Sequence, residues 1–241
     1  MTAVKKRMTH YLILGLGLWF LLLLFLRWRE PRLLYYPLGP LDGHPGNVGL
    51  RYEDIWLTTA DGVRLHSWYL PTTNPAAFTV LFLHGNAGNI SHRLDKLRLL
   101  HDLGVNTLIL DYRGYGRSAG QPNETGTYAD ALAAYRHLIE TRHATPATIL
   151  AFGESLGAAI AVELATTQPL AGLVIEEPFT SVAEVGQKMF PFAPVRLIVR
   201  NRYDTLAKMP RLTAPLLIFH SRVSGGPLRE RRIPYPGRKG K

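Results

Sequence analysis

Short apolar runs recur along the middle of the chain, with longer stretches of helical periodicity between them. The runs have the length and composition of buried strands, and residues 91–103 and 127–139 repeat apolar side chains at helical spacing. Strands that alternate with helices form a mostly parallel sheet with helices on both faces, so the pattern predicts an α/β fold. The apolar runs cover residues 79–83, 107–110, 148–152, 173–175 and 216–219.

An antiparallel start precedes this region. Residues 51–59 alternate apolar and polar side chains, Asp61-Gly62 is typical of a tight hairpin turn, and Val63, Leu65 and Tyr69 alternate in the return strand. The first strands of the sheet are therefore predicted to be antiparallel.

The helical stretches differ in regularity. The helix expected over 91–103 should bury one face, made of Leu94, Leu97, Leu100 and Leu103. Residues 180–209 predict two or three short helices interrupted by Pro191 and Pro194, and we expect this segment to cap a substrate pocket.

The N-terminal segment is apolar over a length close to that of a membrane span. Tyr11 to Leu26 carries no charge, and a spanning helix needs about 20 residues. No small-residue cleavage site follows Leu26, which favours a transmembrane signal anchor over a cleaved signal peptide or a buried core helix. Three basic residues flank each side, and with the free amino terminus they predict a cytoplasmic N-terminus and a domain on the outer side of the cell membrane, periplasmic or extracellular.

These patterns divide the chain into four parts. Residues 1–32 are the expected membrane anchor, 33–50 a Pro- and Gly-rich linker, 51–220 the α/β domain and 221–241 a basic tail. The chain has 241 residues, of which 46% are hydrophobic and 19% charged, enough for one sizeable core. It has no cysteine, which excludes disulfides and thiolate metal sites.

The net charge of +10 belongs to the two ends of the chain. Residues 1–32 carry +5 and residues 221–241 carry +6, which leaves −1 for residues 33–220. A nucleic-acid-binding domain needs a basic surface within its fold, so we expect no nucleic-acid partner.

The sequence Gly153-Glu-Ser-Leu-Gly157 lies between a predicted strand, 148–152, and a predicted helix, 156–164. A serine between two glycines at such a turn is typical of the nucleophile elbow of acyl-transfer enzymes. The glycines leave room for a strained backbone at the serine. Ser155 is therefore the candidate nucleophile.

A second glycine-rich turn, His84-Gly-Asn-Ala-Gly88, follows the predicted strand 79–83. An oxyanion hole needs two backbone N–H groups, one from the residue after the nucleophile and one from the loop after an earlier strand. Leu156 and Asn86 fit these positions. We expect His84 to be structural and hydrogen-bonded within its loop, because in such enzymes the base follows the serine and the acid in the chain.

Together with Asp111-Tyr-Arg-Gly-Tyr-Gly-Arg-Ser118, these motifs resemble the alpha/beta-hydrolase superfamily. The apolar N-terminus and the Tyr-Tyr-Pro segment resemble its single-pass, membrane-anchored branch, related to serine peptidases and dienelactone-hydrolase-like esterases. The resemblance covers residues 33 to 220 and implies the alpha/beta-hydrolase fold. It also implies hydrolysis of small-molecule or peptide acyl substrates through an acyl-enzyme, with neither cofactor nor metal.

The resemblance ends after the predicted strand 216–219. In the family a His-Gly-x-x-Asp-x-x-Val-Pro segment follows and delivers the acid, but here the acid position falls on Ser224. A further strand, the catalytic histidine and a helix should come next, and residues 221–241 match none of them. We therefore expect a truncated or frameshifted C-terminus that lacks the last strand and helix and leaves an exposed apolar edge strand. The alternative is a natural variant whose basic tail binds acidic lipid or a partner.

Few residues remain as acid and base. Glu177, with its neighbour Glu176, ends the sixth strand, where some members of the superfamily keep their acid, and His220 is the remaining histidine after the serine. Two further carboxylates are expected to be structural: Asp111 should order its glycine-rich loop, and Asp204 should cap a helix that begins at Thr205.

Two functions follow from these observations. The first is a membrane-anchored serine hydrolase of ester, thioester or amide bonds, impaired in this chain by the loss of its acid and base. The second is a non-catalytic, membrane-anchored protein of the same fold that is used for binding.

Overall fold

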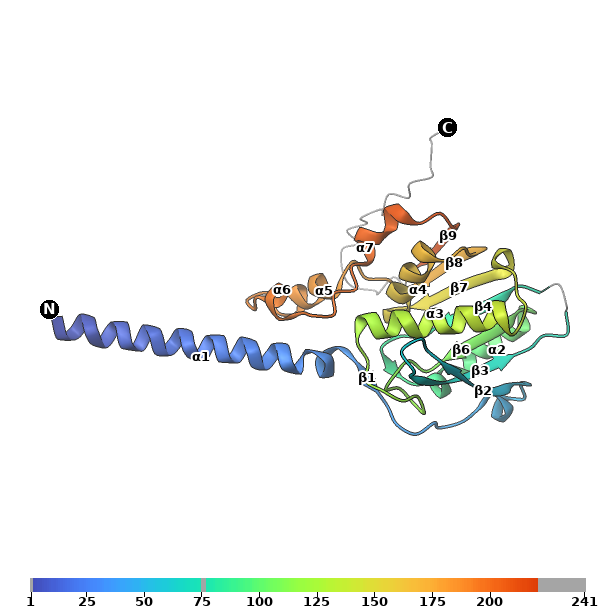
Figure 1. Ribbon diagram of the computed structural model, residues 1–241, viewed down its shortest axis with the longest axis horizontal. Helices are drawn as coiled ribbons and strands as arrows, with labels where there is room; N and C mark the ends of the chain where they lie inside the picture. The colour runs from blue at the N-terminus through green and yellow to red at the C-terminus, as the bar shows by residue number, and fades with distance from the viewer. Residues whose placement is uncertain (1, 75–76, 221–241) are drawn as a thin grey trace, which may run out of the picture.

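A seven-stranded sheet organises the domain in the computed structural model, which describes residues 2–74 and 77–220 (Figure 1). The strand order is β2-β3-β6-β4-β7-β8-β9; β3 runs antiparallel to both of its neighbours, and all other pairs are parallel. The predicted α/β fold with antiparallel first strands is thus confirmed. The strands are β2 Glu53–Thr58, β3 Arg64–Leu70, β4 Thr79–Leu83, β6 Asn106–Leu110, β7 Ile149–Glu154, β8 Gly172–Glu176 and β9 Leu216–Phe219.

Helices cover both faces of this sheet, as predicted. The side chains of β4 alternate between the two faces: Val80 and Phe82 belong to the core with α2, whereas Leu81 and Leu83 belong to the core with α3 and α4. Every residue of β4 is buried, which explains why its sequence is a continuous apolar run. The helices are α2 Leu94–Asp102, α3 Glu124–Glu140 and α4 Leu156–Thr167.

The helix expected over 91–103 is shorter than predicted. It is preceded by a 3-10 turn, η2 Ile90–Arg93, and the expected apolar position Leu103 lies beyond its end with 68% of its surface exposed. The helix ends there because Gly104 adopts a φ of 72° and its N–H donates to the carbonyl of His101. The prediction for Leu103 was therefore wrong.

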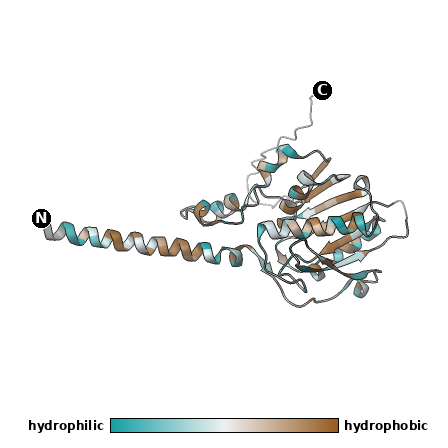
Figure 2. Cartoon of the chain, in the orientation of Figure 1, coloured by the Kyte–Doolittle hydropathy of each residue, from teal (hydrophilic) through white to brown (hydrophobic). Residues whose placement is uncertain are grey.

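The N-terminal helix α1 Thr2–Leu34 projects from the domain (Figure 1). Lys5–Leu34 contains an 18-residue stretch with a mean hydropathy of 2.1 and is long and apolar enough to cross a membrane. Figure 2 shows that the middle of α1 and the central strands of the sheet are both hydrophobic. The two differ in environment, because central strands such as β4 are buried whereas apolar side chains of α1 such as Leu12 and Leu18 are exposed.

Residues 33–50, expected as a linker, pack against the domain. β1 Tyr36–Pro37 pairs in parallel with β5 Ala87–Gly88, and the 3-10 turn η1 Pro45–Val48 follows. Tyr35 is buried, and its hydroxyl lies 2.8 Å from that of Tyr203. The segment therefore fixes the end of α1 to the domain.

The expected short helices of residues 180–209 are present: α5 Val182–Met189, α6 Val195–Ile198 and α7 Thr205–Lys208, followed by the 3-10 turn η4 Met209–Arg211. The predicted capping role of Asp204 was wrong. Asp204 occupies the N-cap position of α7, but its side chain makes no capping hydrogen bond, and its carboxylate pairs with Arg202 Nε at 2.9 Å instead.

Within the described residues, β9 is an edge strand with exposed apolar side chains. Leu217 and Phe219 each expose 52% of their surface, and Ile218 exposes 38%. The remainder of the prediction for this end, namely Ser224 and a missing last strand and helix, falls on residues 221–241 and lies outside the described residues.

Candidate active site

Ser155 adopts the strained backbone of a nucleophile elbow. It follows β7 directly and precedes α4, with φ 51° and ψ −108°. A positive φ at a residue other than glycine carries a strain of order 1–3 kcal/mol. Its N–H donates to the carbonyl of Glu176 at 2.9 Å, and its carbonyl accepts from Ala158 N at 3.0 Å. These bonds hold the turn between the carboxyl ends of β7 and β8.

The two glycines of the elbow have no room for a side chain. A Cβ at Gly153 would lie 2.6 Å from Ala158 Cα, and one at Gly157 would lie 2.7 Å from the carbonyl oxygen of His84 and closer still to that of Leu83. Close packing of α4 on β7 and on the end of β4 therefore requires glycine at both positions. The predicted reason for the Gly-x-Ser-x-Gly pattern, room for a tight turn, matches this geometry.

The loop after β4 lies beside the serine. A Cβ built on Gly85 would lie 3.7 Å from Ser155 Cβ. The backbone N–H groups of Asn86 and Leu156 make no hydrogen bond within the part of the chain that the structure describes. Two unpaired N–H groups beside a serine can stabilise negative charge that develops on a substrate oxygen when both are directed at it.

The position of Asn86 is fixed by residues that the sequence analysis did not single out. The carbonyl of Asn86 accepts from Tyr36 N at 3.1 Å and from the Tyr115 hydroxyl at 2.9 Å. Its side-chain amide donates to the carbonyl of Leu34 at 2.9 Å. The end of α1 and strand β1 thus hold the candidate oxyanion loop. No local pattern identifies such contacts, because they join segments about 50 residues apart.

His84 is structural, as expected. Its ring is fully buried, and Nδ1 donates to the carbonyl of Gly85 at 2.7 Å. Burial lowers the pKa of His84 to about 4, against the smaller opposing effect of the Asp111 carboxylate. Asp111 in turn accepts from Ile90 N at 2.9 Å and packs against Gly116, so it orders its glycine-rich loop as predicted.

The lowered pKa of His84 predicts acid sensitivity. In the unfolded chain His84 protonates near its ordinary pKa of 6.5, whereas the folded protein resists protonation down to about 4. As the pH falls through this window the unfolded state binds the proton first, so the free energy of unfolding decreases, by roughly 3 kcal/mol in total. Urea unfolding of the detergent-solubilised chain at several pH values measures this decrease. In His84→Asn the decrease in the free energy of unfolding between about pH 6.5 and 4 should be smaller by about that amount. An unchanged decrease would show that other groups cause it.

Two basic residues at the start of α2 form ion pairs with carboxylates in and next to the elbow. Arg93 Nε lies 3.2 Å from Glu154 Oε2, and Lys96 Nζ lies 2.6 Å from Glu176 Oε2. Arg93 also donates through Nη2 to the carbonyl of Ala87 at 3.0 Å. Glu176, named with Glu177 as a possible acid, is thus held in an ion pair. The sequence did not predict that Arg93 and Lys96 lie at the site. The one pattern that could have indicated it is their spacing of three residues near the start of a helix, which places them on one face.

The structure brings the two remaining candidates for acid and base together. His220 Nδ1 lies 2.8 Å from Glu177 Oε2, at the carboxyl ends of β9 and β8. Glu177 has a φ of 49° and donates its N–H to the carbonyl of Phe219. A histidine paired through Nδ1 with a carboxylate has the arrangement of a general base and its orienting acid. The imidazole is 60% exposed, however, and follows β9, which β8 separates from β7, the strand that precedes Ser155.

Known proteins resemble this chain in sequence. Residues 74–206 match the family described as serine aminopeptidase, S33. The chain is 40% identical over 206 residues to the uncharacterized protein Rv2307c of Mycobacterium tuberculosis, covering 85% of this chain and 72% of that protein. It is 33% identical over 212 residues to the alpha/beta hydrolase domain-containing protein WAV2 of Arabidopsis thaliana, covering 79% and 69% of the two chains.

Solved structures agree with these relatives. An alpha-beta hydrolase from Vibrio vulnificus superposes with a TM-score of 0.61 at 26% identity, over 72% of this chain and 64% of that one. The Pyrococcus furiosus esterase Pf2001 superposes with a TM-score of 0.60 over 77% and 76% of the two chains, and at 23% identity it shows likeness of fold alone. With the serine elbow and the glycine-rich loop in place, these matches assign the chain to the alpha/beta hydrolases, in the family described as serine aminopeptidase, S33.

Proposed function

We propose that this chain is a membrane-anchored serine hydrolase that cleaves ester, thioester or amide bonds through an acyl-enzyme at Ser155. The observation that carries the proposal is the backbone of Ser155, held at φ 51° between two glycines that admit no side chain. Strain of this kind is concentrated at active sites, and in a nucleophile elbow it directs the serine hydroxyl out of the strand-to-helix turn. Membership of a hydrolase family supports the same reaction class.

The proposed reaction follows from the groups around the elbow. The Oγ of Ser155 attacks the carbonyl carbon of the substrate and gives its proton to a base, and the N–H groups of Asn86 and Leu156 bind the oxyanion. The bond to the leaving group then breaks, and the leaving group takes the proton from the base. Water attacks the acyl-enzyme in the same way and releases the acid product together with free Ser155.

We assign the base and the acid in this chain to His220 and Glu177, and we expect them to work poorly. Strands β7 and β9 are two strand spacings apart, about 10 Å, so the imidazole must reach across β8 to accept the serine proton. Its large exposure also leaves it free to turn towards water. The hydrolase in this chain is therefore impaired relative to one with a complete triad.

Replacing this base should have a modest effect. A well-positioned general base contributes about 10²–10⁴ in rate, so we expect His220→Ala to lower the turnover of a p-nitrophenyl ester by roughly tenfold to a hundredfold. Glu177→Gln should lower it less, because the imidazole remains. The matched control is His101→Ala, which removes another exposed histidine beside a carboxylate, Asp102 at 3.4 Å. Equal turnover in the wild type and in His220→Ala would remove both residues from the mechanism.

We propose that α1 is the membrane anchor and that it is retained in the mature protein. A cleaved signal sequence would have the same composition, but the end of α1 makes hydrogen bonds to the domain. Glu30, 4% exposed, accepts hydrogen bonds from Asn201 N at 3.0 Å and from Asn201 Nδ2 at 2.7 Å. A buried carboxylate satisfied by the domain supports retention of α1 in the mature protein.

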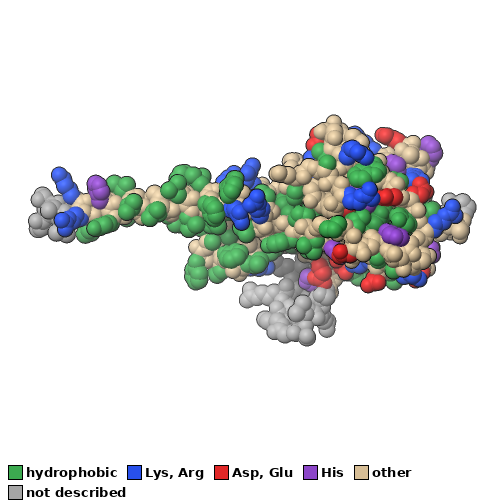
Figure 3. All heavy atoms as spheres, turned by 90° about the horizontal axis from the view of Figure 1, so that it is seen from below, with side chains coloured by type: hydrophobic (Ala, Val, Ile, Leu, Met, Phe, Trp, Pro, Cys, Tyr) green, Lys and Arg blue, Asp and Glu red, His purple; other side chains and the backbone are tan. Residues whose placement is uncertain are grey.

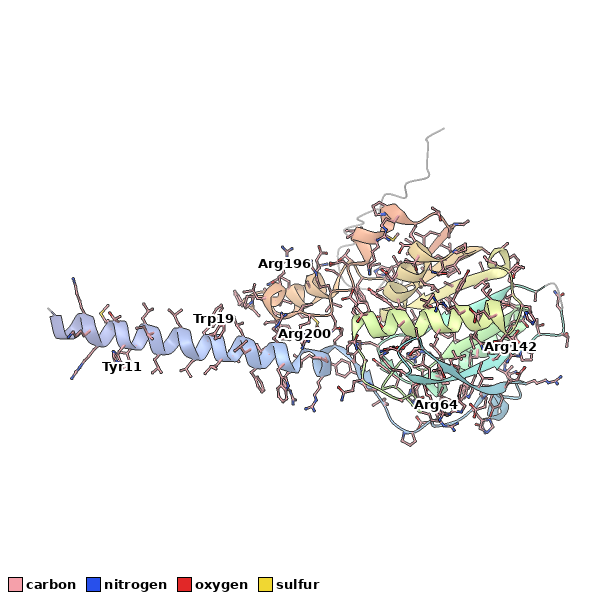
Figure 4. The ribbon with its side chains drawn as sticks, viewed as in Figure 1. Tyr11, Trp19, Arg64, Arg142, Arg196 and Arg200 are labelled. Carbon is pink, nitrogen blue, oxygen red and sulfur yellow. The ribbon has the colours of Figure 1, made fainter. Side chains whose placement is uncertain are left out.

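The outward orientation of the domain stays a prediction. The exposed residues Arg196 and Arg200 lie beside the end of α1 and add to the basic residues on the domain side (Figure 4). These two residues oppose the predicted orientation, which rested on the free amino terminus as the one positive charge in excess of three basic residues on each side of the span.

A further inference from the structure

The segment that carries α5 and α6, residues 182–199, exposes an unusual number of large apolar side chains. We call it the cap. Soluble monomers rarely expose contiguous apolar surface of this kind, and where they do it marks a site of interaction with a protein, a ligand or a membrane. The exposed fractions are Val185 40%, Met189 67%, Phe190 60%, Phe192 100% and Leu197 61%.

The cap lies along α1 at the level of its apolar span. α6 packs against α1, and Arg27 Nη1 donates to the carbonyl of Leu197 at 3.0 Å. Leu23 and Leu26 are partly buried in α1, whereas their neighbours on its other sides are exposed. From this contact the cap extends back along α1 towards Trp19 (Figures 1 and 4), and apolar atoms of both form one continuous surface (Figure 3). A bilayer that surrounds Leu23 must therefore also meet the cap.

The charges of the cap fit a lipid headgroup layer. Arg196 and Arg200 are exposed, and Arg27 and Arg32 of α1 are exposed at the same end of the span. Between residues 182 and 200 the single acidic residue is Glu184, whose carboxylate accepts a hydrogen bond from Thr180. An apolar surface bordered by arginines is the composition of an element that lies in the interface of an anionic membrane.

We propose that the cap is a second membrane-contacting element, with Met189, Phe190, Phe192 and Leu197 inserted into the headgroup and upper acyl region beside α1. The occupant is a lipid bilayer because the apolar surface of the cap continues that of the proposed span. The inference rests on the proposed anchoring by α1, and it adds that the catalytic domain is held against the membrane at two points. Interfacial apolar faces of this kind enter to a depth of about 5–10 Å.

Single cysteines in the full chain test the proposal, since the natural sequence has none. We would label Phe192→Cys with an environment-sensitive fluorophore and reconstitute the chain into nanodiscs of phosphatidylcholine and phosphatidylglycerol with doxyl groups near the headgroup. The expected result is loss of most of the fluorescence on addition of the doxyl lipid. Leu103→Cys, which is 68% exposed at the end of α2, should keep its fluorescence in the same nanodiscs.

A label at a third position tests the anchoring by α1 independently of the proposed contact of the cap with the membrane. Phe20→Cys, in the middle of α1 and 58% exposed, reports insertion of the span itself. Quenching at residue 20 without quenching at residue 192 would overturn the second contact and leave the anchor intact. Absence of quenching at both residues would overturn both. Since Phe192 is fully exposed, its replacement does not disturb the core.

Discussion

In Ser155→Ala, hydrolysis of a p-nitrophenyl ester should fall at least about a hundredfold, and labelling by a fluorophosphonate probe should disappear. In the proposed mechanism the probe phosphonylates the hydroxyl of Ser155, and no other group replaces that hydroxyl in the variant. The Asn86 and Leu156 amides remain in the variant, so any residual rate reports binding and oxyanion stabilisation alone. The thermal unfolding midpoint should change little, because the substitution removes one partly buried oxygen and keeps the backbone of the elbow.

Ser67→Ala is the matched control for this variant. The hydroxyl of Ser67 is buried in β3 and has no hydrogen-bond partner among the described residues. Its removal should leave labelling and turnover at the wild-type level. Equal labelling of wild type and Ser155→Ala would contradict the assignment of the nucleophile. Labelling of neither the wild type nor the variant would instead favour the non-catalytic binding protein that the sequence left as the alternative.

Gly157→Ala should destabilise the domain by more than about 3 kcal/mol, beyond the usual cost of an added methyl group in a packed core. The new Cβ would overlap the carbonyl of Leu83 and lie 2.7 Å from that of His84, and both belong to backbone that cannot move without disturbing the oxyanion loop. Alanine is otherwise the better helix former by about 1 kcal/mol, so any loss isolates the steric overlap. Urea unfolding of the detergent-solubilised chain measures the change.

Gly39→Ala provides the comparison for this variant. No atom lies within 4 Å of the place that its Cβ would take, so stability should change by less than about 0.5 kcal/mol. A Gly157→Ala chain as stable as Gly39→Ala would show that α4 can move away from β4. In that case the packing of the elbow against the candidate oxyanion loop would be looser than it is in the structure.

The strands were predictable because local pattern and final environment agree. Residues 79–83 form a continuous apolar run since both faces of β4 are covered, and the hairpin at Asp61-Gly62 joins β2 and β3 in the expected antiparallel pair. The elbow was predictable for a related reason. Glycine is required at 153 by contacts within one strand-turn-helix unit and at 157 by contact with the end of β4, and both requirements fall within a five-residue pattern.

Contacts between segments that are distant in the sequence were not predicted, because they produce no local sequence pattern. The pairing of β1 with β5 joins residues 36–37 to residues 87–88, and the sequence of 33–50 indicated only a linker. The ion pair of Glu177 with His220 depends on two strands ending at the same edge of the sheet. Periodicity also could not place the end of α2, because Gly104 stops the helix before Leu103 can join the buried face.

The contacts at the end of α1 have a consequence for the site. The carbonyl of Leu34 accepts from the side chain of Asn86, and Tyr36 N donates to the carbonyl of Asn86, so the residue proposed to bind the oxyanion is held by residues at the end of the candidate membrane span and directly after it. Together with the cap, this arrangement places the end of α1 in contact with two parts of the domain. The full chain, with α1 in a bilayer or detergent, is therefore the form in which activity should be measured.

The most direct test of the central claim is to react the full chain with a fluorophosphonate and locate the adduct by peptide mass spectrometry. The account predicts one adduct, on the peptide that contains Ser155, which is lost when the protein is unfolded before reaction. An adduct on a different serine, or no adduct on folded protein, would contradict the assignment of Ser155 as the nucleophile of a serine hydrolase.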